Sequence, residues 1–195
     1  MKTGKPDAME SGTPPGQRYV RRWVIYSALG TPALDLRQWS LRITGLVERE
    51  MNYSYNQLVG SPLMVSLRQD FHCVTGWSIP DVLWEGIPIK ALTKEALVKP
   101  EAKWVLFRCA DRYTAPVPVA DALADNSIIA FRMDGKPLSL EQGFPARPVI
   151  PHLYAWKSAK WLTEVEFIRD YADGFWEIRG YHERGNVWSE ERYKA

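Results

Sequence analysis

The sequence predicts an α+β domain made mainly of mixed β-sheet with short helices. Its apolar segments are short, and several of them alternate apolar with polar residues, as half-buried strands do. Fourteen prolines interrupt the chain, which leaves room only for short helices. A length of 195 residues, with 46% hydrophobic and 25% charged residues, suits one globular domain with a substantial core.

Strands and helices already alternate in the first half of the chain. Residues 39–44 alternate apolar and polar side chains and predict a strand. Ser54 can cap a short helix through Leu58, because serine favours a helix start, and Gly60 and Pro62 then stop the helix. Residues 64–72 are expected to be extended, and residues 89–98 are expected to form a short helix.

The second half of the chain continues the same pattern. Residues 103–109 form a nearly continuous apolar run, which predicts a strand buried on both faces. A short helix is expected at residues 120–124. Residues 128–133 lead into Asp134-Gly135, a strong hairpin signal. Residues 161–168 alternate again and predict a further strand.

The two ends of the chain differ from this core region. Residues 1–17 are polar and rich in glycine, proline and serine, so we expect a flexible N-terminal tail. Residues 18–195 are expected to form a single domain, with a C-terminal arm from about residue 171. Residues 174–184 mix aromatic rings with both charge signs, which suits an arm docked on the domain or a lid over a ligand.

Composition argues against several classes of function. The net charge of +2, without a block of lysine or arginine, does not predict a nucleic-acid partner. No apolar segment is long enough to predict a membrane span. The two cysteines show no zinc spacing and no disulfide framework, so we expect a reducing compartment and a cytoplasmic protein. Most of the nine tryptophans are expected to fill the core.

One of the two cysteines lies in a setting that suggests chemistry. Cys73 stands between an extended segment and Gly76, where a thiol can be a buried filler, a nucleophile or a ligand for a soft metal. His72 is adjacent, but neighbouring strand residues point to opposite faces, so it is not placed as a general base. No strand–turn–helix elbow surrounds Cys73, which favours ligation over nucleophilic attack. Cys109 lies inside an apolar run and is expected in the core.

A second candidate site is a basic cluster in a stretch rich in proline and glycine. Arg147, Lys157 and Lys160 lie within 14 positions of one another. Arginine binds phosphate with two parallel hydrogen bonds, lysine adds a point charge, and backbone amides at residues 157–160 can form a nest. A solvated basic loop explains the same charges equally well, so charge spacing leaves both interpretations open.

Taken together, the two clusters resemble the sulfite oxidase family of molybdenum-cofactor domains. Residues 71–78, Phe-His-Cys-Val-Thr-Gly-Trp-Ser, are similar to the family segment whose cysteine binds the metal, and residues 81–89 are similar to its continuation. Residues 142–160 resemble a second family segment, which ends in Tyr-x-x-Lys-Ser-x-Lys. The resemblance covers residues 39–168, and it is strongest to small bacterial members related to the methionine sulfoxide reductase catalytic subunit.

This resemblance implies a molybdopterin cofactor and an α+β fold of mixed sheet. It implies that Cys73 supplies the protein thiolate to molybdenum. It also implies a set of cofactor-binding residues on the N-terminal, central and basic segments: Arg22, His72, Cys109, Gln142, Arg147, Lys157, Ser158, Ala159 and Lys160. Backbone donors to the cofactor's phosphate are expected from Ser158 and Ala159.

The reaction implied by the resemblance is oxygen-atom transfer to or from a small substrate, with electrons exchanged with a separate protein partner. Arg108, Asp111, Arg112 and Tyr113 follow the buried strand, and they either line the substrate mouth beside Cys73 or belong to a solvated loop. If the substrate is an oxyanion, Arg108 or Arg112 is the expected counter-charge. Two alternatives stay open. The chain could be a non-catalytic module that binds a pterin or another phosphorylated ligand, or a cysteine hydrolase.

Overall fold

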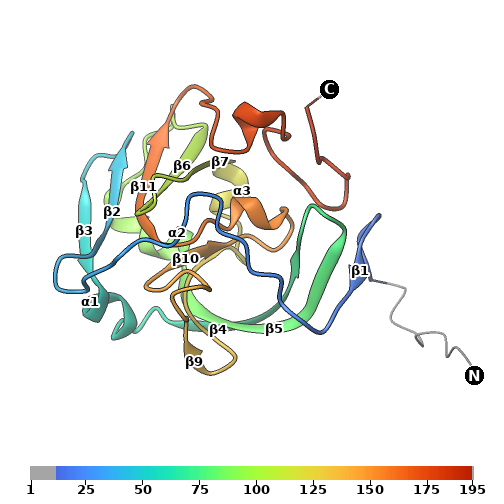
Figure 1. Ribbon diagram of the computed structural model, residues 1–195. Helices are drawn as coiled ribbons and strands as arrows, with labels where there is room; N and C mark the ends of the chain where they lie inside the picture. The colour runs from blue at the N-terminus through green and yellow to red at the C-terminus, as the bar shows by residue number, and fades with distance from the viewer. Residues whose placement is uncertain (1–11, 195) are drawn as a thin grey trace, which may run out of the picture.

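The computed structural model describes residues 12–194, which form two β-sheets connected by loops and short helices (Figure 1). The first sheet has six strands, and its central strand β5 pairs with β1, β4 and β8. Its strands are β1 (Arg18–Tyr19), β4 (Val65–His72), β5 (Trp77–Pro88), β8 (Ile128–Met133), β9 (Lys136–Pro137) and β10 (Arg147–Val149). The pair β1–β5 is parallel, and the other pairs in this sheet are antiparallel.

The second sheet has five strands in the order β3-β2-β11-β6-β7. They are β2 (Ser40–Gly45), β3 (Met51–Ser54), β6 (Trp104–Cys109), β7 (Thr114–Pro118) and β11 (Leu162–Ile168). Strands β2 and β11 pair in parallel, although about 120 residues separate them, and the other pairs are antiparallel. Both sheets are therefore mixed, and the predicted fold class is confirmed.

All helices in the described part of the chain are short. They are α1 (Tyr55–Val59), α2 (Ile89–Leu92), α3 (Val119–Ala122) and the 3₁₀ turns η1 (Lys94–Ala96), η2 (Ala155–Lys157) and η3 (Glu177–Arg179). Ser54 caps α1 as predicted, and Gln57 completes a capping box with it. The single helix expected at residues 89–98 is instead split into α2 and η1. None of the described helices is long and apolar enough to span a bilayer.

The longest strand, β5, was not predicted; it contains Pro80 and Asp81, whose residue types favour turns. Both residues lie within β5 at a β-bulge, where they stand opposite the single residue Asp70 of β4. Asp81 adopts a φ of 54°, and its amide donates to the Asp70 carboxylate at 2.9 Å. A bulge leaves one residue outside the ladder, and so it tolerates proline inside a strand.

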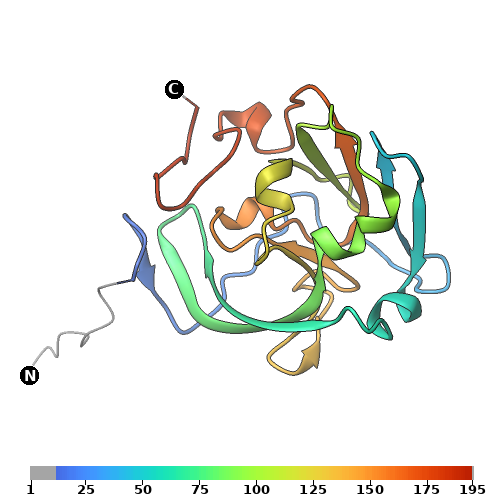
Figure 2. The same ribbon diagram turned by 180° about the vertical axis from the view of Figure 1, so that it is seen from behind.

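The hydrophobic core is divided into clusters that follow the two sheets. The larger cluster joins the inner face of the second sheet to β5 and β8, through side chains such as Phe107 and Phe131. A smaller cluster lies along the first sheet and includes Phe71 and Trp84. Figures 1 and 2 show the β4–β5 pair bent into a long arch, with β1 and the C-terminal segment near its far end.

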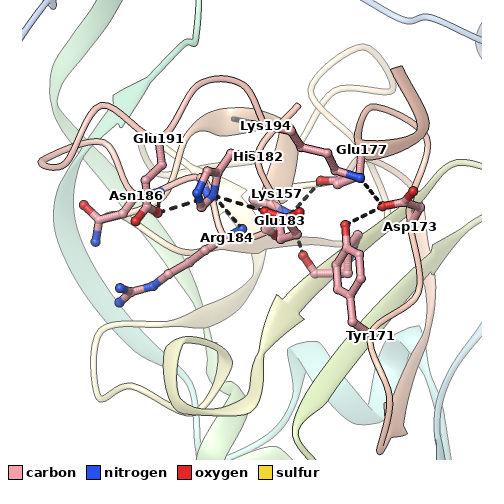
Figure 3. Close-up of polar contacts among 12 residues, drawn as sticks. Lys157, Tyr171, Asp173, Glu177, His182, Glu183, Arg184, Asn186, Glu191 and Lys194 are labelled. Atoms are coloured by element: carbon pink, nitrogen blue, oxygen red, sulfur yellow. Dashed lines mark hydrogen bonds and ion pairs between the residues drawn. The ribbon is translucent and has the colours of Figure 1, made fainter. Parts of the chain in front are cut away.

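Residues 171–194 are attached to the rest of the fold by a buried ion pair (Figure 3). The Lys157 ammonium donates to the Glu177 carboxylate at 2.6 Å and to the Pro116 carbonyl at 2.7 Å. Both charged side chains have an exposed fraction of 0%. Trp156 donates its indole N–H to the same carboxylate at 2.8 Å. These bonds hold η3 against β7 and η2.

Replacing Lys157 with Met is expected to lower the free energy of unfolding by about 3–5 kcal/mol, because the Glu177 carboxylate is then buried and unpaired. Urea denaturation measures this change. Lys194→Met is the control, since it removes an ion pair to Asp173 whose partners are both partly exposed. The control should shift the urea midpoint little, and equal losses in the two variants would contradict this assignment.

Candidate active site

A cavity of about 460 Å³ opens beside the turn that follows β4. Its walls come from parts of the chain that are distant in sequence: residues 23–28, residues 71–77, residues 111–113, Met133, residues 141–161, and Trp176 and Tyr181 of the C-terminal segment. Most of the lining is aromatic or aliphatic, with a few polar side chains among it, as is usual for a cofactor or ligand site. Five of the nine tryptophans line this cavity, namely Trp23, Trp77, Trp156, Trp161 and Trp176. The expectation that most tryptophans only fill the core was therefore too simple.

Cys73 lies on the cavity wall in a tight turn between β4 and β5. Its amide donates to the Trp77 carbonyl at 2.8 Å, and the Gly76 amide donates to the Cys73 carbonyl at 3.0 Å. Gly76 closes the turn with a φ of 90°, which favours glycine. The Cys73 sulfur is partly exposed, forms no disulfide and lies 3.2 Å from the Thr75 hydroxyl. The two strands thus hold a free thiol at the cavity.

Arg147, at the start of β10, places a buried cation in the same cavity. Its Nη1 donates to the Gln142 carbonyl at 2.9 Å and its Nη2 to the Ser158 carbonyl at 2.6 Å, while the guanidinium lies 5.1 Å from the centre of the Phe71 ring. Its Nε has no partner, and no carboxylate among the described residues pairs with it. Burial lowers the pKa of Arg147 to about 10, so it is still charged at neutral pH. A buried charge of this kind requires an anion.

Lys160 adds a second cation next to Arg147. Its ammonium donates to the Ser27 hydroxyl at 2.6 Å and lies 4.5 Å from the centre of the Trp161 ring. Burial and the nearby Arg147 lower the pKa of Lys160 to about 8. Within residues 12–194, no carboxylate forms an ion pair with this ammonium. The two positive charges therefore lie close together, and no carboxylate among the described residues forms an ion pair with either of them.

The backbone beside these cations offers further donors. The Ala159 and Lys160 amides donate to no other described residue, whereas the Ser158 amide is occupied by the Ala155 carbonyl at 3.0 Å. A Cβ at Gly143 would lie 3.0 Å from the Lys160 Cβ, so glycine allows the two loops to approach closely. Free amides next to two cations form an anion nest. The donors of this part of the cavity fit a phosphate group, with the amides one position later than the sequence suggested.

Many of the predicted site residues meet in this cavity. Those that line it are Cys73, Asp111, Tyr113, Gln142, Arg147, Ser158, Ala159 and Lys160. Burial raises the pKa of the Asp111 carboxyl. The Tyr113 hydroxyl donates to the Trp156 carbonyl at 2.7 Å, which holds its ring in one position.

Four predicted cationic residues do not line the cavity. The Lys157 ammonium is engaged by Glu177, so the expectation that Lys157 binds phosphate is not supported. Arg108 extends from the other face of β6 and pairs with Glu166 at 2.6 Å, which removes it from the substrate mouth. Arg22 is exposed and lies outside the cavity lining. Arg112, the alternative counter-charge for an oxyanion, also lies outside it.

His72 and Cys109 are also outside the cavity lining. The His72 Nδ1 atom lies 2.7 Å from the Ser78 hydroxyl oxygen, and burial lowers the pKa of this imidazole. Cys109 is buried at the end of β6, where burial raises the pKa of its thiol well above the usual value. Both residues support the walls of the site from behind, since alternate strand residues face opposite sides.

Sequence reasoning missed several aromatic residues of the site, notably Tyr26, Trp176 and Tyr181. The ring centres of Tyr26 and Trp176 are 6.3 Å apart, and those of Trp176 and Tyr181 are 4.9 Å apart. The mixed aromatic and charged pattern of residues 174–184 was the available signal, because it suggested an arm or a lid. Arg184, from the same stretch, instead pairs with Asp121 at 2.8 Å.

Comparison with known proteins identifies the family to which this architecture belongs. Residues 28–176 match the family described as the oxidoreductase molybdopterin binding domain. The chain belongs to this family. It is 39% identical to the uncharacterized oxidoreductase YuiH of Bacillus subtilis, over 92% of this chain and 91% of that protein. This molybdopterin domain therefore has molybdopterin, with its molybdenum, as its cofactor.

More distant relatives include enzymes with named activities. The chain is 27% identical to the protein-methionine-sulfoxide reductase catalytic subunit MsrP of Xanthomonas campestris, over 73% of this chain and 49% of MsrP. It is 31% identical to mitochondrial sulfite oxidase of Drosophila melanogaster, over 53% of this chain and 20% of that enzyme. The sulfane dehydrogenase SoxCD of Paracoccus pantotrophus shares its fold, with a TM-score of 0.65 and 20% identity over 91% of this chain and 58% of that one.

The residues present fit this cofactor. No group of three or more His, Cys, Asp and Glu side chains among residues 12–194 could hold a metal ion alone. The single free thiol at the cavity, Cys73, is consistent with a metal whose other ligands come from an organic cofactor. The unpaired Nε of Arg147 and the free amides of Ala159 and Lys160 suit its phosphate.

The anion nest should bind inorganic phosphate in the protein without cofactor, and the affinity should fall as the pH rises above about 8. Lys160 is protonated below its pKa of about 8 and attracts the anion, whereas above that pH it loses its charge. The loss can reach roughly tenfold per pH unit. The phosphate-induced rise in Tm, measured from pH 6.5 to 9.5, follows this affinity.

Lys160→Gln should weaken phosphate binding and abolish the pH dependence near 8. Arg22→Gln is the matched control, because Arg22 is exposed and outside the cavity. An unchanged pH profile in Lys160→Gln would contradict the role assigned to Lys160.

Proposed function

We propose that this molybdopterin domain is an enzyme that transfers an oxygen atom to or from a small substrate. The observation that carries the proposal is that the free Cys73 thiol and the uncompensated Arg147 cation line the same cavity. The bound cofactor supplies the two-electron redox chemistry. In one direction the substrate loses an oxygen atom, which leaves as water with two protons and two electrons, and the other direction is the reverse.

Each polar residue of the cavity takes a distinct role in this proposal. Cys73 binds the metal as a thiolate, which the metal stabilises. Arg147, Lys160 and the Ala159 amide hold the phosphate. Gln142 lines the cavity beside Arg147 and contacts the cofactor through its side-chain amide.

Tyr181 is assigned as a hydrogen-bond donor to the reacting oxygen. Burial and the proximity of Tyr193 and Cys73 raise the pKa of its phenol, so the hydroxyl is protonated at neutral pH. Its ring is held between Trp156 and Trp176, with centres 5.1 and 4.9 Å away. A fixed, protonated donor can stabilise negative charge on the oxygen during transfer.

The charges in the cavity favour a neutral substrate over an oxyanion such as sulfite. Arg147 and Lys160 are the lining residues with positive charge, and Asp111 and Glu141 are those with negative charge. Because the cofactor's phosphate takes up both cations, a negative balance faces the substrate. The aromatic walls then suit a small organic oxide, and the name of the MsrP relatives supports such a substrate.

The remaining parts of the proposal concern partners and location. Electrons are exchanged with a separate protein, and the cytoplasm expected from the cysteine content is the proposed compartment. The alternative of a non-catalytic pterin-binding module predicts no turnover with any electron acceptor or donor. The cysteine hydrolase alternative predicts activity without molybdenum.

Metal analysis tests the central proposal. Protein produced in a host that makes molybdopterin should contain close to one molybdenum per chain, with a thiolate-to-metal charge-transfer absorption. Cys73→Ser should abolish turnover and this absorption yet retain pterin, because other residues hold the phosphate. Cys109→Ala is the control and should keep both. Absence of molybdenum, or an unchanged spectrum in Cys73→Ser, would contradict the proposal.

Substrate preference tests the charge argument. With molybdenum-loaded enzyme, kcat/KM for reduction of a neutral aryl sulfoxide by a reduced dye should exceed that for sulfite oxidation by at least about tenfold, since like charges repel within a site. Asp111→Asn should narrow the difference, because it removes a negative charge from the cavity. A preference for sulfite in the unmodified enzyme would overturn the argument.

A further inference from the structure

Segments on both sides of the family-matching region, residues 28–176, converge on the turn that bears Cys73. On the N-terminal side, β1 pairs in parallel with the beginning of β5. The Arg18 amide donates to the Gly76 carbonyl at 3.0 Å. The Gln17 side-chain oxygen accepts from the Ser78 hydroxyl at 3.0 Å. On the C-terminal side, a single arginine reaches the same turn.

That arginine is Arg192, 118 residues after its partner in the turn. Its Nη1 donates to the carbonyl of Val74, the residue next to Cys73. Its Nη2 donates to the Gly16 carbonyl at 3.2 Å, and its guanidinium lies 5.0 Å from the centre of the Tyr154 ring. The side chain has an exposed fraction of 19%, so these contacts are largely shielded from water. Arg192 thus connects the cysteine turn, the N-terminal segment and the buried ring of Tyr154.

The Val74 carbonyl depends on this contact. Within the described residues, backbone bonds of the turn involve the amides and carbonyls of Cys73 and Gly76, and no backbone amide donates to the Val74 carbonyl. A charged donor makes a stronger bond than a neutral one and restricts the orientation of the peptide that it holds. The peptide bond held in this way joins Val74 to Thr75. Its orientation therefore sets the path of the chain directly after Cys73.

The packing of Gly16 restricts the turn from another direction. A Cβ at Gly76 would lie 3.1 Å from the Gly16 carbonyl oxygen, which shows how closely the two backbones approach. Arg192 donates to this same carbonyl. Loss of Arg192 would therefore release two backbone segments that now hold the turn in place.

We propose that Arg192 is a positioning residue, which holds the Cys73 turn so that the thiol faces the cavity in one orientation. Arg192 itself does not line the cavity. The inference rests on the proposed role of Cys73 as metal ligand. It adds that a residue beyond the family-matching region fixes the orientation of the metal-binding thiol.

Thiol reactivity in the protein without cofactor tests whether Arg192 holds the Cys73 turn in place. In a Cys109→Ala background, where Cys73 is the remaining cysteine, Arg192→Gln should accelerate alkylation of Cys73 by iodoacetamide. The rate should rise roughly tenfold, because the loss of one charge-assisted hydrogen bond makes local opening of the turn easier by about that factor. Arg192→Lys should restore part of the slow rate, because an ammonium can bond one of the carbonyls but lacks the planar fork.

Arg179→Gln provides the matched control on the same segment, since Arg179 bonds locally to the Phe175 carbonyl and is exposed. Its alkylation rate should equal that of the parent protein. The same rate in Arg192→Gln and in its parent would overturn the proposal. The alkylation experiment does not need metal. It therefore tests the role of Arg192 even if the Cys73→Ser variant shows that the thiol does not bind the metal.

The molybdenum-loaded enzyme provides the second readout. Arg192→Gln should retain molybdenum, shift the thiolate-to-metal absorption and lower kcat with little change in KM. A normal spectrum and kcat, accompanied only by a lower Tm, would mean that Arg192 merely stabilises the fold, and would contradict the positioning role.

Discussion

The buried guanidinium of Arg147 is the constraint around which the site is organised. It makes two hydrogen bonds to backbone carbonyls and lies against the Phe71 ring, but no carboxylate within the described residues neutralises it. A charge in such surroundings is costly unless an anion binds there. The loops that hold Arg147 also carry Lys160 and the free amides of the nest. The fold therefore keeps a destabilising feature that a phosphorylated cofactor can relieve.

Two other cations of the same region have different roles: one can bind a ligand, and the other stabilises the fold. Lys157 and Lys160 are three positions apart, yet Lys157 is buried against Glu177 and Lys160 faces the cavity. The first attaches the C-terminal segment, which in turn brings Trp176 and Tyr181 to the cavity wall. Glu177 neutralises Lys157 within the protein, whereas Lys160 keeps a positive charge that is available to a ligand in the cavity.

Much of the fold and part of the site could be predicted from local patterns. The Ser54 helix cap and the hairpin at Asp134-Gly135 depend on residues a few positions apart, and both are present. Strand β5 was missed because its proline is accommodated by a bulge opposite Asp70, and a bulge depends on the partner strand. The outward direction of Arg108 was missed because Glu166, its partner, lies on a neighbouring strand.

The sequence by itself determined the family, the mixed-sheet fold class and the two segments that carry Cys73 and Arg147, since each of these follows from a motif or a short-range pattern. The tertiary structure decided which cations are free, which aromatic rings form the walls and which residues hold the cysteine turn. These features depend on contacts between distant positions, such as the 118 residues that separate Arg192 from Val74. Burial and charge pairing at such contacts are properties of the folded chain as a whole.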